Sequence, residues 1–121
     1  PETGSSLGDA MAEVYKAGIN PYWWKITGLG NQEEWQKMTG VLDNYDPEVG
    51  VIIFGNDGPI EEFEKLFRVA RSTPHTCGFA VGSYIFWEPW EQFLEGKIKK
   101  NEIAIEISQR YQSVLKIWHN I

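Results

Sequence analysis

The sequence has one cysteine, two histidines and few basic residues, and each scarcity excludes a class of protein. A single cysteine cannot form a disulfide within the chain, and we expect Cys77, which lies in an apolar run, to be a small buried hydrophobe. His75 and His119 are too few and too far apart for a metal-ligand pattern, so we expect no metal and no other cofactor. A net charge of −6, from 11 basic and 17 acidic residues, argues against partners such as nucleic acid or an anionic membrane.

Long apolar runs are also missing. The longest falls short of the roughly 18 residues that a membrane span needs, and the N-terminus lacks the charged-then-apolar layout of a secretion signal. We therefore expect a cytoplasmic protein. The chain begins "PETGSS" without a methionine, which is consistent with a piece of something longer. At 121 residues we expect a single domain over 1–121, with residues 1–6 as a flexible N-terminal segment.

What the sequence does contain is a regular alternation of helix and strand patterns. A helix is predicted from Leu7, with Ser6 as its N-cap and Gly18 as its stop. A second helix begins after the N-cap Asn31, and a third has Pro59 in its first turn. Between and after these helices stand three strand-like runs: "INPYWWKI", "VGVIIFG" and "TCGFAVG". The remainder is predicted to be helical, in pieces broken near Pro89 and Gly96.

This order predicts an α/β fold with a parallel sheet and helices packed outside it. The second and third strands read as continuous apolar runs, which is typical of strands covered on both faces. Three such strands leave two long hydrophobic edges. We therefore expect the chain either to self-associate or to be part of a larger barrel that completes its sheet.

One lysine lies in the middle of the most apolar strand. Because side chains alternate along a strand, Trp23, Lys25 and Thr27 share one face, while Trp24 and Ile26 share the other. If the face of Lys25 becomes the inside of a closed barrel, the ammonium is desolvated and the amine becomes a nucleophile for a carbonyl carbon. The alternative is that Lys25 extends its head to water at the strand end.

Glycines end the second and third strands. Gly55 and Gly82 allow a backbone to approach an anion, and the helix that follows each directs N–H groups toward it. Gly55 with Asn56, and Gly82 with Ser83, are therefore candidate substrate-binding residues in a phosphate site; the alternative is that the glycines are ordinary turn residues. The aromatic cluster of Tyr84, Phe86, Trp87 and Trp90 is either core packing or a binding surface.

Four stretches carry a resemblance to a known family: "AGINPYWWKITGL", "GVIIFGND", "GFAVGSYIFWEPWEQFLEGKI" and "ISQRYQSVLKIW". Together they resemble the C-terminal portion of the DUF2090 family, over nearly the whole chain. That family is similar to class I aldolases of the tagatose-bisphosphate type. The resemblance implies that the three strands are the sixth to eighth of a (β/α)8 TIM barrel.

The resemblance also implies a reaction and residues for it. The reaction is the retro-aldol cleavage of 2-deoxy-5-keto-gluconate 6-phosphate to dihydroxyacetone phosphate and malonate semialdehyde. Lys25 falls on the Schiff-base position of the family, and the loops at Gly55 and Gly82 fall on its phosphate site. The expected partners are thus a phosphorylated sugar substrate and either a second copy or the remainder of the barrel.

The sequence departs from the family pattern at two positions. Thr27 stands where the family usually has a glutamate, and Ser83 stands where it usually has an arginine. A carboxylate that moves protons and a guanidinium that binds phosphate are therefore missing from those places. These departures keep a different class of function open, a non-catalytic interaction or assembly module that pairs through its strand edges.

Overall fold

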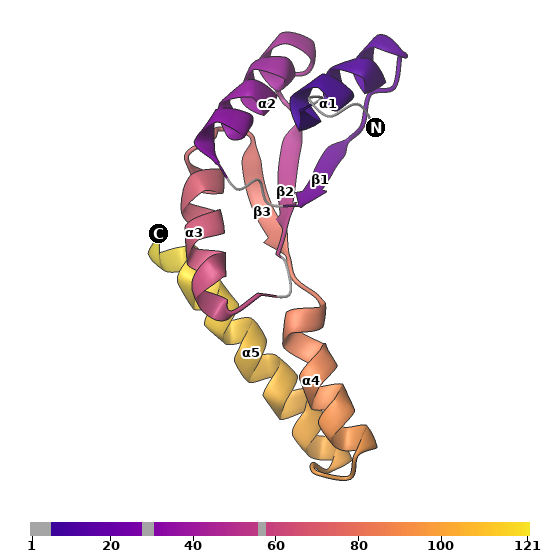
Figure 1. The fold of residues 1–121 in the computed structure, drawn as a ribbon, viewed down its shortest axis with the longest axis vertical. Helices are drawn as coiled ribbons and strands as arrows, with labels where there is room; N and C mark the ends of the chain where they lie inside the picture. Colours follow the sequence, from indigo (N-terminus) through magenta and orange to yellow (C-terminus); the bar gives the residue numbers. More distant parts are fainter. Residues whose placement is uncertain (1–5, 28–30, 56–57) are drawn as a thin grey trace.

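The computed structural model describes residues 6–27, 31–55 and 58–121. It shows an α/β architecture with a single open sheet, as the sequence predicted (Figure 1). The elements in chain order are α1 (Leu7–Lys16), β1 (Trp23–Thr27), α2 (Gln32–Tyr45), β2 (Gly50–Phe54), α3 (Ile60–Arg71), β3 (Thr76–Ala80), α4 (Ser83–Leu94) and α5 (Lys100–Asn120).

Local sequence signals set the helix boundaries. Ser6 caps α1, because its hydroxyl accepts a hydrogen bond from the backbone N–H of Asp9 at 3.1 Å while the Asp9 carboxylate accepts one from the N–H of Ser6. Asn31 caps α2 by accepting from the N–H of Glu34 at 2.8 Å. Gly18, just beyond α1, has a φ of +81°, the left-handed conformation that glycine adopts most readily. These predicted caps are confirmed.

The sheet is parallel throughout, with the strand order β1-β2-β3. Lys25 pairs with Ile52, and Thr27 pairs with Phe54, so the first two strands run in register. Consecutive parallel neighbours joined by right-handed crossovers place their helices on the same face of the sheet. The order is therefore the one that a segment of a βα repeat would have.

The core lies between the sheet and the helices on that one face. Ile26, Val51 and Ile53 point into it from the strands and are buried. Buried residues of α1, α2, α3 and α5 complete it: Met11, Tyr15, Trp35, Met38, Leu42, Phe63, Phe67, Ala70 and Val114. Within the described residues, helices therefore cover only one face of the sheet. The continuous apolar runs of the strands had predicted that both faces would be covered.

A helical hairpin extends past the end of the sheet. After β3, α4 runs away from the strands, and α5 returns along it to pack on α3 (Figure 1). The return is fixed by aromatic contacts, since Trp118 of α5 lies with its ring 5.1 Å from that of Phe67 and 5.2 Å from that of Phe79. Arg71 also donates to the backbone oxygen of Trp118 at 2.7 Å. The C-terminal half of α5 therefore belongs to the core, and α4 reaches the core only at its start, where the Tyr84 ring lies 5.1 Å from that of Phe63.

One prediction about this region needs correction. Pro89 does not interrupt the helix, because α4 continues through it to Leu94 and only Gly96, with a φ of +75°, follows its end. A proline inside a helix costs about 3 kcal/mol. Pro89 is buried in the hairpin, where α4 packs along α5, and we attribute the tolerance of the proline to this packing.

Candidate functional site

The face of the sheet opposite the helices carries the candidate catalytic lysine. On β1, Trp23, Lys25 and Thr27 are exposed while Ile26 is buried, which confirms the predicted alternation of side chains. We call this surface the open face. It comprises Trp23, Lys25 and Thr27 of β1, Ile52 and Phe54 of β2, and Gly78 and Ala80 of β3.

The surroundings of Lys25 on the open face are apolar. Its Nζ lies 4.4 Å from the centroid of the Phe54 ring, a cation–π contact. Ile52 is its partner in the register, and Trp23 precedes it on the same face. Among the described residues of the open face, Lys25 carries the only charge, so the strand sets one amine on an aromatic and aliphatic surface.

Cys77 borders the same face, and the prediction of a buried cysteine was wrong. Cys77 is exposed, although its thiol donates to the backbone oxygen of Val51 at 3.4 Å. The reason is a bulge in the pairing of β2 with β3: Val51 pairs with Thr76 and Ile52 with Gly78, which leaves Cys77 as the extra residue. Its Sγ lies beside Gly50, at 2.9 Å from where a Cβ would stand, so the small glycine makes room for the sulfur.

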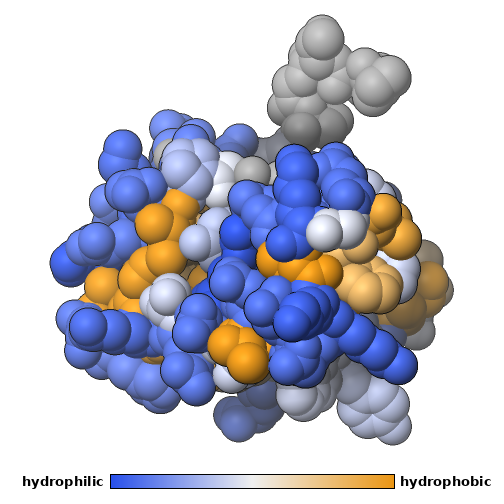
Figure 2. Space-filling view, turned by 90° about the horizontal axis from the view of Figure 1, so that it is seen from below, coloured by the Kyte–Doolittle hydropathy of each residue, from blue (hydrophilic) through white to orange (hydrophobic). Residues whose placement is uncertain are grey.

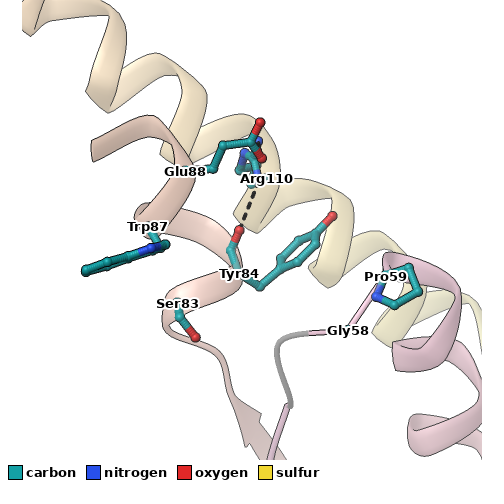
Figure 3. Close-up of a pocket in the computed structure, with 7 residues that line it drawn as sticks. All are labelled: Gly58, Pro59, Ser83, Tyr84, Trp87, Glu88 and Arg110. Atoms are coloured by element: carbon teal, nitrogen blue, oxygen red, sulfur yellow. Dashed lines mark hydrogen bonds and ion pairs between the residues drawn. The ribbon is translucent and has the colours of Figure 1, made fainter. Parts of the chain in front are cut away.

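A hollow of about 450 Å³ lies beyond the carboxyl ends of β2 and β3. It opens between the first turns of α3 and α4 and the side of α5 (Figure 3). In that view Trp87 points away from Tyr84. The lining residues are Gly58, Pro59, Ser83, Tyr84, Trp87, Glu88 and Arg110.

Arg110 brings a positive charge to this hollow from a distant part of the chain. Its guanidinium donates to the backbone oxygen of Tyr84 at 3.1 Å and to Oε2 of Glu88 at 2.7 Å. The Arg110 side chain remains one quarter exposed. Sequence reasoning missed Arg110, because only the fold of the hairpin places α5 against the start of α4. Arg110 thus places a guanidinium at the hollow, although the residue directly after Gly82 is Ser83.

The remaining predicted site residues lie in different surroundings. Ser83 lines the hollow, and Gly82 precedes it as the N-cap of α4. Gly55 is buried, and its N–H already donates to the backbone oxygen of Ala80 at 3.0 Å. A Cβ at Gly55 would overlap the ring of Phe63, so close packing explains this glycine. Asn56 lies outside the described residues.

The structure does not gather all candidates at one point. Lys25 is on the edge strand β1, whereas Ser83 follows the opposite edge strand β3, with β2 between them. Both residues belong to one parallel sheet, in which the carboxyl ends of all strands lie at the same edge. The described residues hold no cluster of three or more metal-ligating side chains, and none of their helices is long and apolar enough to cross a membrane.

Comparisons with known proteins give one finding. A family model described as "Uncharacterized protein conserved in bacteria (DUF2090)" matches residues 1–121. No curated protein and no solved structure matches the chain. The match covers the entire sequence, including the strand that carries Lys25 and the segments that follow β2 and β3.

Proposed function

The chain belongs to the DUF2090 family, and on that premise we propose that it is part of a class I aldolase-like barrel in which Lys25 forms a Schiff base with a phosphorylated keto sugar acid. A substrate of this class is 2-deoxy-5-keto-gluconate 6-phosphate. In this proposal the three strands are the sixth to eighth of a (β/α)8 barrel. Further strands close the sheet and turn the open face into the barrel interior.

The observation that carries the proposal is the position of Lys25 on the open face. Its neighbours there are aromatic and aliphatic, and the amine contacts the Phe54 ring. In the chain by itself the lysine is exposed. Once strands cover the open face, water is removed from the amine, and a low-dielectric interior disfavours the ammonium form. An uncharged amine in such a place is the nucleophile that imine formation requires.

The proposed reaction balances with Lys25 as the nucleophile. The amine attacks the ketone carbon of the substrate, and loss of one water gives a protonated imine. The carbon–carbon bond then breaks, its electron pair moves into the imine to give an enamine, and malonate semialdehyde leaves as the aldehyde. Protonation of the enamine and addition of water release dihydroxyacetone phosphate and restore the amine. The proton transfers need a base, and the described residues of the open face include no carboxylate.

The hollow at the carboxyl end of the sheet supports binding of the phosphate group. It lies against the first turns of α3 and α4, and the N-terminal end of a helix favours negative charge. Arg110 adds a guanidinium, which can form charge-assisted hydrogen bonds with phosphate oxygens. Glu88 already pairs with Arg110, so phosphate would have to share or displace that carboxylate.

A second function, a non-catalytic assembly module, is favoured by one observation. Trp23 on the open face is 62% exposed, next to an exposed Lys25. Large apolar surface of this kind marks interaction sites. The chain would then use the open face and its strand edges to bind a partner, without any chemistry at the lysine.

Borohydride trapping separates the two functions. The folded chain is incubated with dihydroxyacetone phosphate, the imine is reduced with borohydride, and the intact mass is measured. The aldolase proposal expects one covalent adduct that disappears in Lys25→Met and persists in the matched variant Lys65→Met, which removes an exposed lysine of α3. Absence of the adduct in a folded assembly in which the open face is covered would favour the assembly module.

A further inference from the structure

A stripe of large apolar side chains runs along the outside of α4. Phe86, Trp90 and Leu94 are spaced four residues apart and are 43%, 45% and 66% exposed. Trp87 lies beside them and is 54% exposed. At 3.6 residues per turn the four side chains fall within an arc of about 100°. We call these four residues the α4 stripe.

The opposite side of α4 is apolar as well. Ile85, Pro89 and Phe93 are less exposed than the stripe and lie on the side that packs along α5. Glu88 pairs with Arg110 of α5, and Glu91 and the C-cap Glu95 lie between that contact and the stripe. A helix that is apolar on most of its circumference is normally buried on most of it. In this chain α5 covers one side, and the α4 stripe is left exposed. Figure 2, which views the molecule from below, shows apolar surface reaching the outside among hydrophilic residues.

Completion of the sheet does not cover the α4 stripe. New strands would add beside β1 and β3, in the plane of the sheet, whereas α4 runs from the end of β3 away from the strands (Figure 1). The stripe therefore needs an occupant other than the strands that close a barrel.

We infer that the occupant is the α4 stripe of a second copy of this chain, in a twofold-symmetric dimer. The spacing is symmetric about Trp90, since Phe86 precedes it by four residues and Leu94 follows it by four. When two such helices pack antiparallel with the twofold axis at Trp90, each Phe86 lies opposite the other copy's Leu94. A surface that matches itself in this way is what a twofold interface requires.

The exposed apolar area of the stripe is about half of what one partner of a standard interface contributes, so it can form the core of such an interface. A large aromatic side chain buries about 150–250 Å² when fully covered, so three half-exposed rings and Leu94 offer on the order of 400 Å² of apolar area per copy. Each partner of a standard interface contributes about 800 Å². The apolar core of an interface is surrounded by a polar rim. Here Glu91 and Glu95 border the stripe and would form part of that rim.

This inference does not depend on the aldolase proposal, and its test uses solution mass. Light scattering or sedimentation equilibrium is expected to give twice 13.9 kDa for the chain. Trp90→Glu and Leu94→Glu each place a carboxylate in the stripe and are expected to raise the dimer dissociation constant by roughly 30-fold or more. Gln109→Glu adds the same charge on an exposed position of α5 and is expected to leave the dimer intact.

A fourth variant distinguishes this dimer from association through the sheet. Trp23→Glu changes the open face and leaves α4 untouched, so the inference expects it to remain dimeric. Circular dichroism and thermal unfolding establish that each variant is folded. A monomeric parent chain would overturn the inference, and so would a dimer that Trp23→Glu dissociates or that Trp90→Glu leaves unchanged.

Discussion

The side-chain nitrogen of Lys25 lies 4.4 Å from the centroid of the Phe54 ring, across the pair of strands β1 and β2. The contact joins residues that are 29 positions apart, and the parallel register brings them together because Thr27, two residues beyond Lys25, pairs with Phe54. It holds the amine over the open face instead of leaving it directed along the strand toward solvent.

A double-mutant cycle measures this contact. We expect a coupling free energy of about 0.5–1 kcal/mol between Lys25→Met and Phe54→Leu, the size of a cation–π contact at an exposed site. The measurement is the free energy of unfolding in urea for the parent, the two single variants and the double variant. Strictly additive effects would show that the lysine does not rest on the ring.

Two glycines make a matched pair for testing the packing. Gly55→Ala places a Cβ against the Phe63 ring and is expected to reduce the free energy of unfolding by about 1–3 kcal/mol, the usual cost of overpacking. Gly40→Ala lies inside α2 with no atom within 4 Å of the new Cβ. It is expected to stabilise the chain by about 0.5–1 kcal/mol, because alanine loses less backbone entropy in a helix. Urea unfolding of both variants checks this, and a harmless Gly55→Ala would speak for a role in binding instead of packing.

The stability of α1 should depend on pH through Asp9. The Lys37 ammonium donates to its carboxylate at 3.0 Å, and the Ser6 N–H also donates; these contacts hold the pKa of Asp9 at about 2, below its ordinary value of 3.8. A lowered pKa in the folded chain stabilises the fold above the ordinary value, and this contribution is lost as the pH falls from about 4 to about 2.

Thermal unfolding of Asp9→Asn tests that dependence. The variant is expected to have a lower Tm than the parent at pH 7, and the difference should shrink as the pH falls through the same window. Glu48→Gln, an exposed carboxylate in the loop before β2, is the control and should show no such trend. A difference in Tm between Asp9→Asn and the parent that stays constant down to pH 2 would exclude the ion pair and the cap as its cause.

The hollow at the carboxyl end of the sheet predicts opposite effects for its two charged residues. Arg110→Gln removes the guanidinium and is expected to weaken binding of dihydroxyacetone phosphate at least about tenfold. Glu88→Gln removes the carboxylate that pairs with Arg110 and is expected to tighten the binding of dihydroxyacetone phosphate. Titration calorimetry measures both, with Arg68→Gln, an exposed arginine of α3, as the control. Equal affinities in all three variants would place the phosphate elsewhere.

Local signals were sufficient to predict most of the fold. The caps at Ser6 and Asn31, the stop at Gly18 and the alternation of Trp23, Trp24 and Lys25 depend on residues close in sequence, so the sequence alone could specify them. The parallel sheet followed from the order of the elements.

What the sequence did not predict depends on contacts between distant residues. Arg110 reaches the hollow because α5 folds back along α4, and no local pattern distinguishes this arginine from a surface residue. The continuation of α4 through Pro89 has the same origin in the hairpin. Cys77 became exposed through a one-residue bulge, which shifts the side chain without any mark in the sequence. Gly55, predicted as an anion site, is explained by the ring of Phe63.

The most direct test of the account is to locate the trapped adduct by peptide mapping. After borohydride reduction in the presence of dihydroxyacetone phosphate, the chain is digested and the modified residue is identified by tandem mass spectrometry. The account predicts the adduct on Lys25, with Lys65 and the lysines at the hairpin tip, Lys97, Lys99 and Lys100, unmodified. An adduct spread over the exposed lysines, or none on Lys25 in a folded assembly that covers the open face, would contradict it.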